Sequence, residues 1–286
     1  GLATPGLTGL VCLFGLYFPL RGRISFMECV IIGAIGLSLF YASFGIHFSL
    51  LHKTGDGDGF MPGWFRMTLQ GSAFQKSAKK PPSFFFFRSV GYIVFEMIRA
   101  SARIKNKHNW QSSWWSWPLD IRGILYYTDP DHSEGLIAKI YLLGNPIVYW
   151  FVLLFVFLFV MSLPLLLVVR KVRKFRERFR FSVDAVRSYV CVGLFLFSGW
   201  ALNLLPYLDV SRPTFLYHYL PGLWYGVLLS VWLLDQLPNR KALRLSVAIT
   251  LCVATCLVYV YFAPWVYDLH VSKARQKSMQ WLSKWN

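Results

Sequence analysis

The sequence predicts an all-α integral membrane protein, a polytopic helix bundle with about six membrane spans and one long loop. Hydrophobic residues make up 56% of the 286-residue chain, and charged residues only 15%. A soluble domain of this size exposes more charge than that, and the mean hydropathy of +0.45 agrees with a membrane protein. The apolar residues also gather in long runs, which favours helices rather than a barrel.

Each predicted span is a run of roughly 20 apolar residues, the length that crosses a bilayer. We expect residues 1–52 to form two transmembrane helices and residues 53–144 a long loop. Four more helices are expected in residues 145–267, followed by a tail at 268–286. The six runs are 2–20, 24–51, 145–169, 189–208, 214–234 and 245–267.

Basic residues cluster in every second connection, at 21–23, 170–187 and 239–244. Such connections stay in the cytoplasm, so the loop, the connection 209–213 and the tail are expected to be lumenal. The tail carries Lys and Arg against this rule, but late charges weigh less in setting orientation. We attribute the net charge of +17 to cytoplasmic connections and anionic membrane lipid, and not to nucleic acid.

The cysteines and the start of the chain are also informative. All five cysteines lie in apolar runs, which is typical of small core residues rather than of a disulfide framework or a metal site. They are Cys12, Cys29, Cys191, Cys252 and Cys256. Because the chain begins at Gly1 inside an apolar run with no basic segment before it, we expect a piece of a longer or processed protein, without a signal peptide.

One stretch, residues 211–226, crowds ionisable groups at the mouth of a predicted span. Arg212, Tyr217, His218 and Tyr219 all belong to it. Ionisable groups at the edge of a membrane are costly to bury and usually mark a ligand site. The alternative is structural, with Arg212 reaching lipid headgroups and His218 forming a hydrogen bond between helices.

The long loop opens with a glycine-rich acidic segment that contains Asp56 and Asp58. It is either a solvated turn or a cation site, and because it lacks the other ligands of a calcium loop we expect no metal there. Residues 71–87 are interpreted as a basic linker at the membrane surface. Residues 89–102 repeat apolar side chains at helical spacing, which predicts an amphipathic helix.

A tryptophan cluster follows at Trp110, Trp114, Trp115 and Trp117. Three interpretations remain open: an interfacial belt, a platform that stacks on sugars, and hydrophobic core. The sequence contains no Ser-His-Asp, HExxH, CxxC or P-loop pattern. That argues against hydrolase, zinc and nucleotide-driven functions.

Four segments, in the right order, resemble the protein O-mannosyltransferase family, the dolichyl-phosphate-mannose–protein mannosyltransferases. Each segment is modest evidence alone, but together they cover most of the chain between residues 47 and 226. The segments are GDGDGFMPGWFRMTLQG at 55–71; Phe95, Glu96, His108 and Ser112 with WPL at 117–119 and RGI at 122–124; YLLGNP at 141–146; and GW at 199–200 with Pro206, Arg212 and FLYHYLP at 215–221.

The resemblance is to the C-terminal half of the family and departs from it in two respects. Residues 72–88 are too few to hold the MIR domain that eukaryotic members carry between the first two segments. The family's catalytic acidic pair belongs to the N-terminal half, which this sequence does not contain. The catalytic residues are therefore expected outside these residues.

The resemblance implies a bundle of the GT-C glycosyltransferase type in the endoplasmic reticulum membrane. It implies transfer of mannose from dolichyl phosphate mannose to Ser or Thr hydroxyls of acceptor proteins, with the lipid donor as substrate and no certain cofactor. It also implies a homo- or heterodimer with another family member. Membrane lipids are the remaining expected partners.

Negative charge accumulates on the departing lipid phosphate during such a transfer, so cationic groups and hydrogen-bond donors stabilise it. The guanidinium of Arg212 suits that task, and Tyr217, His218 and Tyr219 can add donors. Because Tyr217 and His218 differ by about 100° around a helix, we expect Arg212 and His218 to be the pair on the phosphate side. The resemblance places His108, Trp117 and Arg122 in the loop over the site, where they are expected to shape the pocket for the lipid-linked sugar or the acceptor. Asp56 and Asp58 are expected near the same face, ordering the loop rather than acting chemically.

Two alternative functions belong to other classes of protein. One is a non-catalytic membrane partner subunit of such a transferase, which an acidic pair in the N-terminal half would argue against. The other is a transporter, which is expected to carry polar residues inside several spans. The predicted spans here are nearly all apolar in the middle, which argues against transport.

Overall fold

The structure, a computed structural model, describes residues 3–17, 24–76, 80–129, 135–171, 182–237 and 241–285. The chain forms two compact units, which we describe separately. The small unit is Cys12–Asn106, and the large unit combines Gly1–Val11 with Lys107–Asn286. The basic connection predicted at 21–23, most of that at 170–187 and the start of that at 239–244 lie outside the described residues.

The small unit is built on α2 (Phe26–Leu50) and α4 (Phe85–Arg103). A capping box starts α2: Glu28 N donates to Ser25 Oγ, and Ser25 N donates to the Glu28 carboxylate. The short helices between them are η1 (Asp56–Phe60), α3 (Gly63–Arg66) and η2 (Ala73–Lys76). A core of Met61, Phe65 and Leu69 joins these pieces. The amphipathic helix predicted at 89–102 is confirmed as part of α4.

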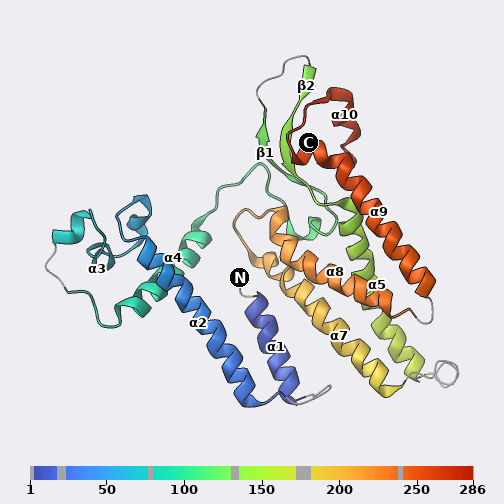
Figure 1. Ribbon diagram of the computed structural model, residues 1–286, viewed down its shortest axis with the longest axis horizontal. Coiled ribbons are helices and arrows are strands. Elements are labelled where there is room, and N and C mark those ends of the chain that lie inside the picture. The colour runs from blue at the N-terminus through green and yellow to red at the C-terminus, as the bar shows by residue number, and fades with distance from the viewer. Residues whose placement is uncertain are drawn as a thin grey trace. The chain divides into compact units, whose positions relative to one another are not determined.

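The large unit contains α5 (Pro146–Lys171), α7 (Val183–Leu202), α8 (Leu220–Asp235) and α9 (Lys241–Val266), drawn in green to red in Figure 1. α8 packs against both α5 and α7. Glycines permit the close approach: a Cβ on Gly226 would clash with Val152 of α5, and one on Gly193 with Phe159. Val152, Phe159 and Leu229 are fully buried where these helices meet.

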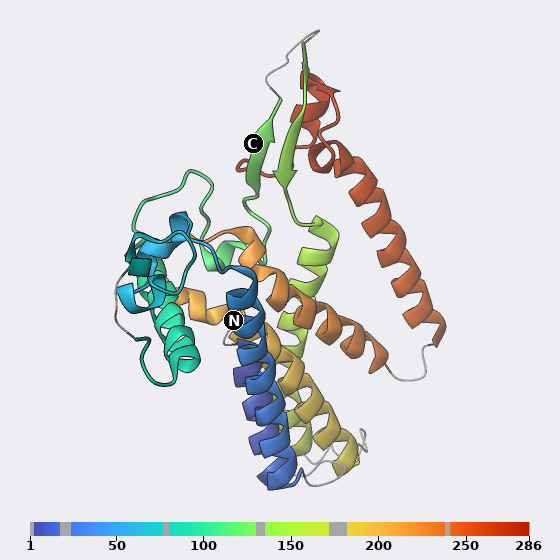
Figure 2. The same cartoon turned by 60° about the vertical axis from the view of Figure 1, so that its left-hand side comes forward.

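Short strands at one end of the large unit were not predicted from the sequence. β1 (Ile124–Thr128) pairs antiparallel with β3 (Lys139–Leu142), and β2 (Leu136–Ile137) pairs with β4 (Val271–Ser272). The latter pairing brings the chain after α9, including α10 (Lys273–Ser278), against the loop that precedes α5. Figure 2 shows β1, β3 and α10 together at this end.

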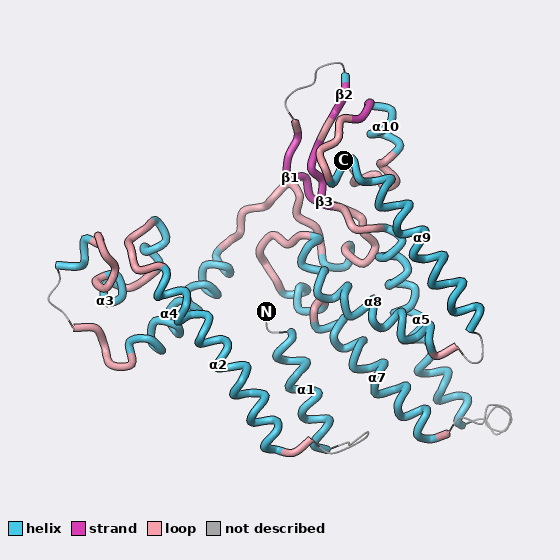
Figure 3. The backbone as a smooth tube through the Cα atoms, viewed as in Figure 1, coloured by secondary structure: helices cyan, strands magenta, loops and turns pink. Residues whose placement is uncertain are grey.

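The connection between α7 and α8 lies at the same end of these helices. It consists of two single 3₁₀ turns, η5 (Leu205–Asp209) and η6 (Leu216–Tyr219), joined by the loop segment visible in Figure 3. Another 3₁₀ turn, η3 (Trp114–Ser116), packs against η5. Within the large unit, the described loop residues after Lys107 are thus neighbours in space of both the α7–α8 connection and the tail.

The chain is a multi-pass membrane protein. Four of the described helical segments are long and apolar enough to cross a bilayer: Phe26–Leu50, Pro146–Val169, Val183–Asp209 and Lys241–Val266. The other two predicted spans correspond to α1 (Ala3–Tyr17) and α8, which are shorter, at 15 and 16 residues. The helical, polytopic fold class is confirmed.

Candidate site at the α7–α8 connection

Two segments that are far apart in sequence are joined by a reciprocal pair of hydrogen bonds. Ser112 N donates to Thr214 O at 2.8 Å, and Thr214 Oγ1 donates to Ser112 O at 2.9 Å. The first residue belongs to the tryptophan-rich loop and the second to the α7–α8 connection. These bonds bring together two of the four segments that carry the family resemblance.

Trp117 is the centre of this junction. It is fully buried, and its Nε1 donates to Ser112 Oγ at 2.9 Å. Its ring stacks on the imidazole of His218, with centroids 5.9 Å apart and planes 16° apart. Tyr207 of η5 contacts both rings edge-on. Of the three interpretations of the tryptophans, core is therefore the one that holds for Trp117.

The imidazole of His218 is held by one nitrogen and free at the other. Its Nδ1 lies 3.1 Å from Phe215 N and 3.0 Å from Phe215 O, so the backbone of that residue engages it in either tautomer. The Nε2 atom has no hydrogen-bond partner within the described ranges of the chain. Tyr217 covers one face of the ring, with centroids 4.4 Å apart. Nε2 of His218 is thus the ring nitrogen that remains available for a further hydrogen bond.

The structure separates the predicted phosphate-side tyrosines. Tyr219 is fully buried, and its hydroxyl accepts a hydrogen bond from Trp200 Nε1 at 2.9 Å. It belongs to the core beneath the junction, with Tyr149 and Leu216. Tyr217 is 41% exposed and lines a cavity. Only Tyr217 of the two is therefore placed to meet a ligand.

Arg212 lies in the connection between η5 and η6 and is partly buried. Its positive charge acts on both His218 and Tyr207. In the part of the chain that the structure describes, its guanidinium makes no hydrogen bond or salt bridge. An arginine that is neither fully exposed nor paired has unused donors, and anionic groups of ligands satisfy such donors well.

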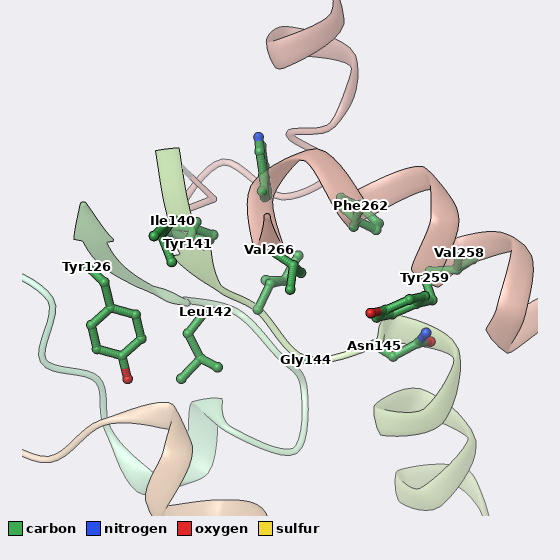
Figure 4. Close-up of a pocket in the computed structure, with 12 residues that line it drawn as sticks. Tyr126, Ile140, Tyr141, Leu142, Gly144, Asn145, Val258, Tyr259, Phe262 and Val266 are labelled. Atoms are coloured by element: carbon green, nitrogen blue, oxygen red, sulfur yellow. The ribbon is translucent and has the colours of Figure 1, made fainter. Parts of the chain in front are cut away.

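Two cavities flank the segment 142–145, which leads into α5. The first has a volume of about 310 Å³ and lies between β3 and the end of α9, with Tyr126, Tyr259 and Phe262 in its wall (Figure 4). The second has a volume of about 240 Å³ and is bounded by Tyr149, Tyr217 and Leu220. Their lining is largely apolar, which suits hydrocarbon groups.

Asp120 is a residue that the sequence interpretation missed. It is fully buried and adopts a left-handed backbone conformation, with φ of 52°. Gly144 N donates to its Oδ1 at 3.3 Å, whereas Oδ2 has no partner among the described residues. Burial raises the pKa of its carboxyl well above the ordinary value, outweighing the hydrogen bond from Gly144. The carboxyl therefore keeps its proton to a higher pH than an exposed aspartate does.

Trp285, in the tail after α10, forms a hydrogen bond with the backbone of Asp120. Trp285 is fully buried, and its Nε1 donates to Asp120 O at 2.7 Å. Trp285 packs in a cluster with Tyr141, Trp265 and Met279. The only sequence signal for this arrangement was an acidic residue directly after the apolar WPL segment, and its partner lies 165 positions away.

Lys139 is a second buried ionisable group near the strands. Its Nζ lies 4.8 Å from the ring centroid of Tyr141 and 4.2 Å from that of Trp265. The ring faces attract the ammonium, but burial lowers its pKa to about 8. Lys139 therefore loses part of its charge in mildly alkaline solution.

The other two predicted loop residues of the large unit, His108 and Arg122, make contacts within the protein. The imidazole of His108 packs edge-on against Phe215, at 5.1 Å between centroids, and its Nδ1 accepts from Trp110 N. Arg122 donates to Asn109 O at 2.7 Å and lies over the ring of Trp110. Both residues lie next to the junction, and the contacts of Arg122 stabilise the loop.

Asp56 and Asp58 belong to the small unit, whereas the residues described above belong to the large unit. The carboxylate of Asp58 accepts hydrogen bonds from Gly55 N and from Thr54 Oγ1, and it caps η1. Asp56 is exposed. Across the described ranges, no three His, Cys, Asp or Glu side chains gather as a metal site requires.

Comparison with known proteins agrees with the resemblance. Residues 86–285 match the family described as the C-terminal four TMM region of protein-O-mannosyltransferase. The chain is 28% identical over 174 residues to dolichyl-phosphate-mannose–protein mannosyltransferase 6 of Saccharomyces cerevisiae, covering 60% of this chain and 22% of that protein. It is 30% identical over 189 residues to protein O-mannosyl-transferase 1 of Homo sapiens, covering 63% and 24%. The chain thus spans about a quarter of the length of these curated relatives.

One solved structure shares the fold. It is the structure of the S. cerevisiae protein O-mannosyltransferase Pmt1–Pmt2 complex bound to the sugar donor, and it matches with a TM-score of 0.57 at 24% sequence identity. The match covers 73% of this chain and 28% of the yeast chain. At this identity the likeness concerns the arrangement of helices.

Proposed function

Because the chain belongs to the protein O-mannosyltransferase family through its C-terminal four-transmembrane region, we propose that it is part of a mannosyltransferase of the endoplasmic reticulum membrane. The transferase moves mannose from dolichyl phosphate mannose to Ser or Thr hydroxyls of proteins. In this reaction the acceptor oxygen bonds to the anomeric carbon while the bond to the lipid phosphate breaks. A general base takes the hydroxyl proton, and the dolichyl phosphate leaves with the bonding electrons.

The part of this reaction assigned to the described residues is stabilisation of the departing phosphate. The observation that supports it is the guanidinium of Arg212, which is unpaired among the described residues and whose charge acts on His218, a residue whose Nε2 has no partner there either. The guanidinium of Arg212 and a neutral N–H donor on His218 stabilise the negative charge that develops on the phosphate oxygens. Tyr217 adds a hydroxyl at the edge of the second cavity.

The remaining groups are assigned to positioning. Trp117 fixes the plane of the His218 ring by stacking, and the Ser112–Thr214 bonds hold the two segments together. The apolar cavities beside them suit the first isoprene units of the lipid. The general base is assigned to the family's N-terminal half, outside these residues.

A dimer with another family member belongs to the same proposal. The name of the matched yeast structure describes two proteins in one complex. The second candidate function, a non-catalytic partner subunit, predicts that the full-length protein alters the activity of a partner and has none that depends on its own site. The variants below discriminate between the two.

The test is Arg212→Ala in the full-length protein, assayed for mannose transfer from radiolabelled dolichyl phosphate mannose to an acceptor peptide. We expect transfer to fall by about 10- to 100-fold, as the loss of a charge-assisted hydrogen bond of about 1.5–3 kcal/mol implies. Arg212→Lys is expected to recover part of the rate, because it restores the charge without the planar fork.

Arg244→Ala is the matched control, since Arg244 pairs with Asp235 at the opposite end of α8. It is expected to transfer mannose at the parent rate. Parent-level transfer by Arg212→Ala, with the same donor KM, would remove Arg212 from the mechanism. Equal activity of all these variants in the presence of an active partner would favour the non-catalytic function.

A further inference from the structure

α4 of the small unit is amphipathic. Around a helix of 3.6 residues per turn, its charged side chains fall on one side and most of its apolar ones on the other, with Phe85 and Phe95 as the exceptions. The apolar face consists of Phe86, Phe87, Val90, Ile93, Val94, Met97 and Ile98. The opposite face carries Arg88, Tyr92, Glu96, Arg99 and Arg103.

Much of the apolar face has no protein cover within the small unit. Met97 is 60% exposed and Ile98 65%. Val90 is fully buried, so the face is covered at its first turns and open further along. Large apolar side chains gathered in this way mark a surface that meets another apolar phase.

The covered turns of α4 lie against a membrane-spanning helix. Phe87 packs edge-on against Tyr41 of α2, with centroids 5.2 Å apart, and Phe86 contacts both Tyr41 and Phe48. Tyr41 is nine positions before the end of α2 at Leu50, or about 14 Å along a helix that rises 1.5 Å per residue. The contact is therefore inside the apolar length of α2 and not beyond its end.

The charged face complements a lipid surface. Glu96 is the one carboxylate of α4, and Arg99 lies 3.3 Å from it. Arg88 and Arg103 add positive charge, and Lys105 and Lys107 follow the helix. Arginine stems lie along apolar groups while their heads reach phosphate, as is usual at a membrane interface.

We propose that α4 is an interfacial helix, embedded beside α2 in the phospholipid leaflet with Met97 and Ile98 among the acyl chains and its arginines at the headgroups. Because α2 crosses the bilayer and contacts α4 through Tyr41, the position of Tyr41 along α2 sets the depth of α4 in the leaflet. This inference concerns how the chain meets the membrane and is independent of the transferase proposal.

The test uses the whole chain in phosphatidylcholine nanodiscs, with the five native cysteines replaced. Nitroxide spin labels are attached after Met97→Cys, Ile98→Cys or Arg99→Cys, one at a time. Collision of each label with oxygen, which dissolves in the acyl region, is compared with collision with a water-soluble nickel chelate. Arg99 is the matched control because it neighbours Ile98 and belongs to the opposite face.

We expect the oxygen-to-nickel ratio at positions 97 and 98 to exceed that at position 99 several-fold. Equal ratios at all three positions would mean that α4 lies in water and would overturn the proposal. Protection of positions 97 and 98 from both reagents would overturn it too, because it would show that protein and not lipid covers this face. Circular dichroism and gel filtration of each labelled protein confirm that it is folded.

Discussion

The indole of Trp117 and the imidazole of His218 stack with their planes 16° apart, although 101 positions separate them in the chain. Trp117 comes from the loop before α5 and His218 from the turn before α8. The stack fixes the orientation of the histidine ring, whose Nδ1 the backbone already engages. A buried side chain in the loop therefore determines where the free Nε2 points.

The stack predicts that neighbouring tryptophans differ strongly in their contribution to stability. Trp117→Ala is expected to lower the free energy of unfolding by about 3–5 kcal/mol, because it empties a fully buried site. Trp115→Ala, at a side chain that is 55% exposed, is expected to change it by less than about 1 kcal/mol. Thermal unfolding in detergent measures both. Similar melting temperatures for the two variants would refute the central position of Trp117.

Asp120 predicts a specific pH dependence of stability. Its pKa is raised in the folded state, so above the ordinary value of 3.8 the folded protein binds more protons at this site than the unfolded chain. The free energy of unfolding then falls as pH rises through the interval between the two pKa values. Below that interval the contribution is fully present, and above the folded-state pKa it is lost.

Asp120→Asn isolates this contribution, because asparagine is neutral, tolerates the positive φ and still accepts a hydrogen bond from Gly144 N. The melting temperature of the parent is expected to fall relative to that of Asp120→Asn as pH increases from about 4 to 8. Parallel curves would show that folding does not raise the pKa of this carboxyl. Asp120→Ala should cost about 1–3 kcal/mol, since it leaves that N–H without a partner.

The close contact between α5 and α8 predicts that a side chain at position 226 is destabilising. Gly226→Ala places a methyl group against Val152 of α5, so we expect a loss of about 1–3 kcal/mol from strain between α5 and α8. Gly36→Ala in α2 is the control, because nothing lies within 4 Å of the added Cβ. Melting of the two purified variants is compared. A Gly226 variant as stable as the Gly36 one would argue that α5 and α8 are not packed this closely.

The predicted orientation is tested by introduced N-glycosylation sites. Gln111→Ser completes a site at the exposed Asn109, and Lys174→Asn with Arg176→Ser creates one next to Phe175. We expect only the first to be glycosylated in microsomes, because the basic connection stays on the cytoplasmic side. The position next to Phe175 lies outside the described residues. Glycosylation of the second site alone would show that the chain has the opposite orientation in the membrane.

Helix positions followed closely from the sequence because apolar length alone determines a span. The run predicted at 145–169 is α5, Pro146–Lys171, and that at 245–267 is α9, Lys241–Val266. α7 begins earlier than predicted, at Val183, since Ser182 caps it by accepting a hydrogen bond from Ala185 N at 3.0 Å. Hydropathy does not register such a cap.

The sequence predicted which residues gather near the candidate site, but it did not predict how their side chains are arranged. The motifs pointed to Arg212, Tyr217, His218 and Tyr219 together, yet Tyr219 is committed to Trp200 in the core. Spacing along a helix could not reveal this, because the segment is a 3₁₀ turn that leads into α8. Which tyrosine is buried depends on what packs beneath the turn.

The sequence by itself determined that this chain crosses the membrane, where its long helices run and which family it resembles, because each of these is written in local apolar length or short motifs. Only the tertiary structure decided that Trp117 stacks on His218 and that Trp285 holds Asp120. It also decided that β2 pairs with a strand beyond α9. Contacts between residues more than a hundred positions apart depend on how the helices pack, and no local pattern in the chain specifies them.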